Sequence, residues 1–263
     1  MIKRFGIIFL CIMLLGLSGC GKEDTGNLED AKKYAEQFFR DYYLRQAHDI
    51  NDIWKDSISE TSKRCGITTE AEYVALYKEE QETNWGYGDF HIESADQLQP
   101  GIFRIRILYS YGYYDSDYTD VPSDFYVRYE NGQYKTLIYG ITDELEIKDR
   151  QDKANDILLE NLKAWQTADG MIVSFDLTNH SDRDIVDPDT NDKVTVTLTT
   201  DDGQEYKCRY GDLINEFANY SNHKMIWFAG AGGKPLKLTV DNLNYRENGM
   251  KLQESTSVTV DLQ

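Results

Sequence analysis

The spacing of apolar residues changes twice along this chain of 263 residues. Residues 5–17 form an unbroken apolar run. Between residues 28 and 81 apolar side chains recur every three or four positions, which is the spacing of an amphipathic helix. From residue 90 onward they mostly alternate with polar residues, as in a strand that buries one face. We therefore expect a short apolar leader, a helical segment and a long strand-rich remainder.

Three helices are predicted in the helical segment. The first covers residues 28–47, where the apolar positions are Ala31, Tyr34, Ala35, Phe38 and Tyr42. The second covers residues 50–58. Thr68 or Thr69 can cap the third, which runs toward Gln81, and Glu72 stands at capping-box distance from Thr69.

Strands follow, at residues 90–93, 102–114, 125–130 and 133–141. In the second of them one face is apolar and aromatic, and it holds Phe103, Ile105, Ile107, Tyr109, Tyr111 and Tyr113. Asn131-Gly132 lies between the last two strands and predicts a tight hairpin, because both residues accept positive φ.

The second half of the chain reads as strands only. The charged stretch 143–153 lacks the apolar density of a core strand, and we interpret it as a linker or a short connecting helix. Asp169-Gly170 separates strands at 158–165 and 171–178, and Met171, Val173, Phe175 and Leu177 share a face. Further strands are expected at 194–199, 205–210, 224–228, 236–240 and 256–262. Short strands with turn signals between them predict a β-sandwich.

Two parts of the chain resemble known folds. Helices, then long strands, then the hairpin from Tyr126 to Lys135 resemble the nuclear transport factor 2-like fold over residues 28–142, which implies a cone-shaped cavity between helices and sheet. The segment Val173–Ser181 resembles a strand edge of immunoglobulin-like domains in bacterial lipoproteins. The expected fold class is α+β: N-terminal helices packed on a curved antiparallel sheet, followed after the 143–153 linker by an all-β immunoglobulin-like sandwich over residues 154–263.

The leader predicts export. Lys3 and Arg4 precede the apolar run, and its 13 residues are too few to span a bilayer, which needs about 20. Residues 1–19 therefore read as a signal peptide rather than an uncleaved anchor. Leu17-Ser18-Gly19-Cys20 resembles the lipobox of bacterial lipoproteins. This resemblance implies cleavage before Cys20, lipidation of Cys20, a lipidated tether over residues 20–27, and an extracytoplasmic protein anchored to the bacterial cell membrane.

The net charge restricts the classes of partner that the protein can bind. Residues 1–19 hold two basic and no acidic side chains, so the remainder carries 26 basic and 46 acidic residues, a net charge of −20. Such a surface repels nucleic acid and anionic headgroups, and we expect no nucleic-acid partner.

Beyond Cys20 only Cys65 and Cys208 remain, distant from each other and without a C-x-x-C pair. Cys208 is in phase with Tyr206 and Tyr210, which indicates a buried strand position.

Candidate chemistry is sparse. The histidines show no metal spacing, although His91 could point into the cone. The acidic loops at 187–192 and at Asp115, Asp117 and Asp120 offer oxygen ligands, but the first lacks the glycine and glutamate of a calcium loop, and turn preference explains both. Tyr109, Tyr111 and Tyr113 could form an aromatic ligand surface, joined by Trp85 and Tyr87, or simply pack in a half-buried strand.

These observations predict a membrane-anchored lipoprotein that is not an enzyme and acts as a binding or interaction module. Its expected partners are the membrane, through the lipid on Cys20, and a carbohydrate, peptide or protein ligand; no cofactor and no metal are expected. One alternative is a small-molecule receptor or enzyme that uses the cavity of the first domain. Another is a purely structural envelope component.

Overall fold

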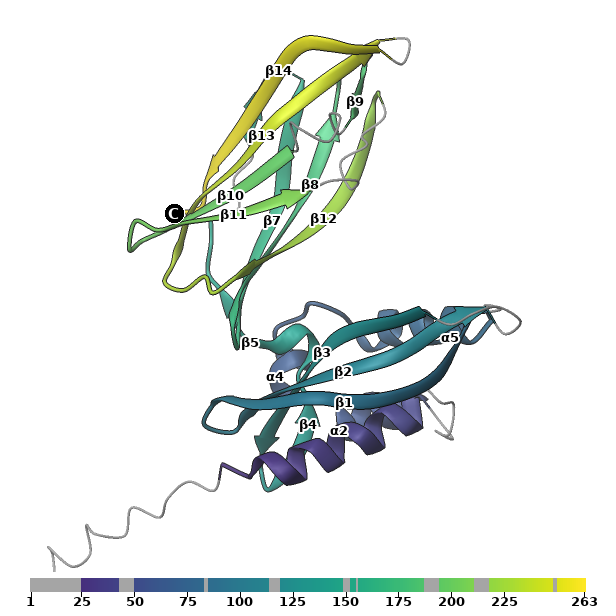
Figure 1. The fold of residues 1–263 in the computed structure, drawn as a ribbon. Coiled ribbons are helices and arrows are strands. Elements are labelled where there is room, and N and C mark those ends of the chain that lie inside the picture. Colours follow the sequence, from purple (N-terminus) through teal and green to yellow (C-terminus); the bar gives the residue numbers. More distant parts are fainter. Residues whose placement is uncertain are drawn as a thin grey trace, which may run out of the picture.

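The computed structural model describes residues 25–42, 50–82, 85–113, 119–148, 152–154, 156–186, 194–210, 218–247 and 250–263. Strands make up 59% of the chain and the helices are few and short, so the protein is mostly β with antiparallel sheets. The expected α+β balance overstated the helices. A helix-covered sheet and a pair of facing sheets form two bodies in contact (Figure 1). In the described ranges no helix is long and apolar enough to cross a membrane.

Four helices are described: α2 Leu28–Tyr42, α3 Ile50–Ser57, α4 Glu60–Arg64 and α5 Glu70–Glu82. Residues 43–47 of the first predicted helix lie outside the described residues, and α4 was not predicted. The predicted capping box at the start of α5 is confirmed. The Thr69 amide donates to Glu72 Oε2 at 2.7 Å, and the Glu72 amide donates to Thr69 Oγ1 at 3.2 Å.

The first sheet has the order β1 Trp85–Gln99, β2 Ile102–Tyr113, β3 Thr119–Glu130 and β4 Gln133–Thr136. Its inner face and α2 form one apolar core, in which Phe39 and Phe103 are among the largest fully buried side chains. The predicted hairpin between β3 and β4 is confirmed, with Asn131 at φ 51° and Gly132 at φ 79°. β4 is shorter than expected, because the chain leaves the sheet at the 3₁₀ turn η1 Ile138–Gly140.

The second body consists of two five-stranded antiparallel sheets that enclose one core. The first sheet has the order β12-β8-β7-β5, with β6 paired to β7; the second has the order β11-β10-β13-β14, with β9 paired to β13. The strands are β5 Ile141–Leu145, β6 Asp152–Ala154, β7 Ile157–Thr167, β8 Gly170–Asn179, β9 Asp184–Val186, β10 Val194–Thr200, β11 Glu205–Tyr210, β12 Tyr220–Ala229, β13 Pro235–Glu247 and β14 Met250–Asp261. The predicted shared face of β8 is confirmed, because Met171, Val173, Phe175 and Leu177 are all fully buried.

The interpretation of residues 143–153 as a linker or a connecting helix is wrong, since this stretch contributes to β5 and β6. Both strands pair with β7. A strand that pairs on one side and buries one face needs few apolar residues, and Leu145 and Ile147 pack against the sandwich core. The low apolar density therefore marked peripheral strands of the sheet.

The two bodies meet at the turn between β7 and β8. The Ala168 amide donates to the Gly140 carbonyl oxygen at 2.8 Å, and Trp165 Nε1 donates to the Cys65 carbonyl oxygen at 2.9 Å. Cys65, Ile141, Trp165 and Ile172 form a small buried cluster there. This contact fixes the β7–β8 hairpin against the end of the first sheet.

Candidate functional site

A cavity of about 330 Å³ lies where β4 ends and β3 continues with β2 as its described partner. Its walls come from five places: the aromatic side chains of α2, Thr68 before α5, the residues Tyr73 and Leu76 of α5, the β3 residues 123–126, and residues 136–139 of the chain that leaves β4. The cavity exists because β4 pairs only with residues 127–130 of β3. Past that point the chain turns away through η1, and no described strand fills the space.

Two large apolar side chains stand exposed among the cavity's lining residues. Leu76 is 55% exposed and Tyr139 is 53% exposed. Tyr139 has φ 52° and ψ 19°, a left-handed conformation that is uncommon for a bulky residue. The following residue, Gly140, has φ 69° and passes so close to the Tyr126 ring that a Cβ there would lie 3.0 Å from it. The backbone of η1 is therefore held in an unusual path that leaves an aromatic side chain at the cavity mouth.

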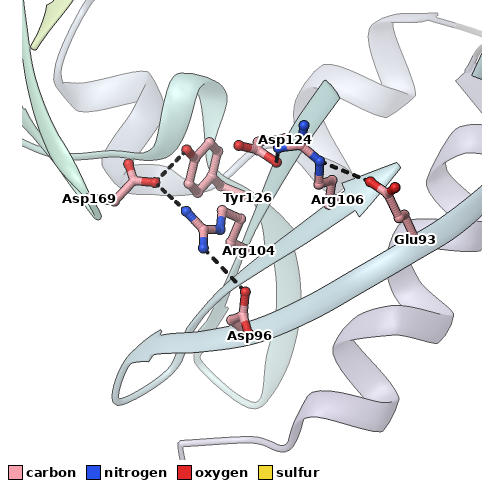
Figure 2. Close-up of polar contacts among 7 residues, drawn as sticks. All are labelled: Glu93, Asp96, Arg104, Arg106, Asp124, Tyr126 and Asp169. Atoms are coloured by element: carbon pink, nitrogen blue, oxygen red, sulfur yellow. Dashed lines mark hydrogen bonds and ion pairs between the residues drawn. The ribbon is translucent and has the colours of Figure 1, made fainter. Parts of the chain in front are cut away.

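Asp124 supplies the carboxyl group of the cavity lining. It lies on the outer face of the sheet, where Arg106 Nη1 approaches Asp124 Oδ1 at 3.4 Å and Arg106 Nε donates to Glu93 Oε2 at 3.0 Å (Figure 2). The Asp124 side chain is 23% exposed. The cavity therefore has apolar walls, and the ion-paired carboxylate of Asp124 lies beside it on the outer face of the strand edge.

A second polar cluster adjoins the cavity at Tyr126 and joins the two bodies. Asp169, in the β7–β8 turn, accepts through Oδ2 from the Tyr126 hydroxyl at 2.9 Å and from Arg104 Nη1 at 3.1 Å (Figure 2). Arg104 also donates to Asp96 at 3.2 Å. Burial, and then the nearby Asp169 carboxylate, raise the pKa of Tyr126 well above its usual range, so this hydroxyl stays a donor. We call Arg104, Tyr126 and Asp169 the joint cluster.

The predicted tyrosine surface is only partly described. Tyr109 is half-buried and packs against Phe39, with ring centroids 6.4 Å apart, and it is absent from the cavity lining. The side chains of Tyr111 and Tyr113, like those of Trp85 and Tyr87, lie outside the described part of the structure. A ligand surface on these tyrosines stays a prediction.

His91 is exposed while its neighbours Phe90 and Ile92 pack on the helix-facing core, so of the two readings of this histidine the solvated one holds and the one that points into the cone does not. Cys65 is buried and Cys208 half-buried, both are free thiols, and burial raises the pKa of each. The strand position of Cys208 is confirmed, and it packs against the sandwich core. Cys20, Asp115, Asp117 and the loop 187–192 lie outside the described residues.

The candidate site residues that sequence reasoning missed are Leu76 and Tyr139. Leu76 has the helical spacing of a core residue, and Tyr139 fell inside the predicted strand 133–141. Tyr139-Gly140 carried a faint signal, since a glycine there allows a turn.

Within the described ranges no three or more His, Cys, Asp or Glu side chains are grouped so that they could hold a metal ion. Comparison with protein-family models, curated proteins and solved structures finds no match to this chain. The cavity and its rim are therefore interpreted from their own geometry.

Proposed function

We propose that this chain is an extracytoplasmic bacterial lipoprotein, anchored to the cell membrane by a lipid on Cys20, that acts as a non-enzymatic binding module. Its ligand occupies the cavity between α2, α5 and the edge of β3. The observation that carries the proposal is the exposure of Leu76 and Tyr139 at the rim of an apolar cavity. We also propose that the first body is a nuclear transport factor 2-like domain and the second an immunoglobulin-like sandwich.

The size and chemistry of the cavity support ligand binding. Its volume of about 330 Å³ falls at the lower end of ligand pockets, which hold roughly 300–1,000 Å³. The carboxyl of the lining, Asp124, is engaged by Arg106, which suits recognition better than proton transfer.

The anchor is tested by Cys20→Ala in the full chain. We expect the wild type to fractionate with membranes and its N-terminal peptide to carry acyl chains in mass spectrometry. The variant should accumulate as an uncleaved precursor or leave the membrane. A cleaved Cys20→Ala form that stays on the membrane would contradict the proposal.

The ligand site is tested by a thermal-shift screen of the full chain against sugars, peptides and small apolar compounds. A ligand at 100 times its Kd stabilises the folded state by about 2.7 kcal/mol. Ser123→Phe places a ring in the cavity without removing a wall, and Ser94→Phe places the same ring on the exposed outer part of β1 as a matched control. We expect a ligand shift that survives in the control and disappears in Ser123→Phe. An equal shift in both variants would place the site elsewhere.

A further inference from the structure

The cavity opens beside an unfilled strand position on β3. The Leu137 amide donates to the Tyr126 carbonyl oxygen at 2.8 Å, on the β4 side of β3. The Tyr129 amide donates to the Gly101 carbonyl oxygen at 2.7 Å, on the opposite side. Backbone groups of successive strand residues alternate between the two sides. The β2–β3 register is continuous over this stretch, so Asp124 and Pro122 face the same way as Tyr126, away from β2.

Between Pro122 and Tyr126, this edge offers the backbone groups of one residue for pairing with an added strand. On the β4 side the Tyr126 carbonyl is already used, and on the far side Pro122 has no N–H to donate. Between them lies Asp124, whose backbone N–H and C=O make no hydrogen bond to another described residue. Pro122 and the charge of Asp124 restrict pairing along this edge, so an added strand would pair with Asp124 in a single register.

The same geometry says which side chains an added strand would carry. Ser123 and Phe125 line the cavity. Residues directly opposite one another in neighbouring strands share a face, so the two residues that flank the one opposite Asp124 would project into the cavity. Leu76 and Tyr139 lie at the rim of the cavity and would cover these two residues of the added strand. The residue opposite Asp124 would lie next to its carboxylate on the outer face.

We infer that β3 binds an extended peptide segment of a partner protein as an additional strand at Asp124, with the pattern apolar, basic, apolar. The inference rests on the proposed function and names the class of its ligand. A basic central residue complements Asp124 across the new strand pair, and opposite charges in that position stabilise a sheet. The net charge of −20 that remains without residues 1–19 favours a cationic partner generally. Main-chain hydrogen bonds supply affinity and the cavity supplies selectivity, as in other strand-addition complexes.

The test uses the full chain and an array of capped nonapeptides, with Ser and Gly flanks and three central positions that sample Leu, Phe, Lys, Glu and Gly. We expect the strongest binding from peptides with apolar residues around Lys. Replacing the central Lys by Glu should weaken binding at least fivefold, and replacing both apolar residues by Gly should abolish it. An array without this preference would overturn the inference.

Two variants at one position separate the carboxylate from the backbone donor. Asp124→Ala keeps the N–H and should lose the preference for Lys over Glu. Asp124→Pro removes the N–H as well, and it costs no bond to β2 because this N–H faces away from β2. We expect Asp124→Pro to bind at least tenfold more weakly than Asp124→Ala. Equal binding by the two variants would refute strand addition.

A measurement on the wild type avoids dependence on the folding of the proline variant. The bound peptide should slow hydrogen exchange of the Asp124 amide, and an unchanged exchange rate in the saturated complex would also refute strand addition.

A small apolar probe, 4-methylphenol, separates this inference from the proposed function. If the wild type binds the probe, Ser123→Phe does not, and no peptide binds, the cavity is a ligand site and the peptide inference fails. If neither the probe nor any peptide binds, both proposals fail.

Discussion

The hydroxyl group of Tyr126 is expected to hold the two bodies of the protein together, and Tyr126→Phe removes only that group. Tyr126 is 7% exposed, and its hydroxyl donates to Asp169 Oδ2 at 2.9 Å. Hydrogen bonds to charged groups contribute about 1.5–3 kcal/mol. Because Asp169 keeps Arg104 as a second donor, we expect a loss near the lower end, about 1.5–2 kcal/mol.

The Arg104 contacts provide a comparison within the same cluster. The Arg104 side chain is 33% exposed and its other partner, Asp96, is 57% exposed. Exposed ion pairs contribute about 0.2–1 kcal/mol, so Arg104→Met should cost less than Tyr126→Phe. Tyr206→Phe, on a half-buried tyrosine whose hydroxyl makes no hydrogen bond to a described residue, is the matched control and should be nearly neutral.

The assay is urea unfolding followed by tryptophan fluorescence, which reports on the joint because Trp165 is 3% exposed in the cluster between the bodies. A double-mutant cycle with Asp169→Asn isolates the Tyr126–Asp169 coupling, which should exceed about 0.5 kcal/mol. Strictly additive effects, or a Tyr126→Phe loss no larger than that of the Tyr206→Phe control, would refute the reasoning.

Three further predictions concern packing and pH. Gly170→Ala should lose about 3 kcal/mol in chemical unfolding, because its Cβ would lie 2.4 Å from the Phe228 carbonyl oxygen; an unchanged midpoint would contradict this. Thr167→Val should gain about 1 kcal/mol, since the buried Thr167 hydroxyl has no hydrogen-bond partner in the described structure; a loss in the same assay would show an unseen partner. Burial raises the pKa of Tyr34 to about 12 against 10.0 in the unfolded chain, so the native state retains the proton more strongly and stability should fall by about 2–3 kcal/mol as pH rises from 10 to 12. Tyr34→Phe should flatten that decline in pH-dependent unfolding, and an equally steep decline in the variant would rule out this origin.

Local chemistry made part of the fold predictable. The capping box of Thr69 and Glu72 is confirmed because its two hydrogen bonds join residues three positions apart. The Asn131-Gly132 turn depends only on two residues that accept positive φ. The buried face of β8 follows from apolar residues at the alternate positions Met171, Val173, Phe175 and Leu177.

The features that the sequence did not predict depend on contacts with residues that are distant in the sequence. The sequences of β5 and β6 resemble a charged linker, and only their pairing with β7 identifies them as strands. Leu76 follows the spacing of a core residue, yet it is 55% exposed, since no described strand pairs with that part of β3 on its β4 side. Tyr139 belongs to a turn because the chain must leave the first sheet and enter the second body within a few residues. The cavity itself is therefore a product of where β4 stops.

The contact between Ala168 and Gly140 has a mechanical consequence. Gly140 ends η1, and the two residues before it, Ile138 and Tyr139, form part of the cavity wall. A force applied to the sandwich is transmitted through the β7–β8 turn to the segment that shapes the cavity mouth. With a ligand in the cavity, as proposed above, tension along the molecule and occupancy of the cavity would be linked, so a load on the sandwich would change the lifetime of that complex.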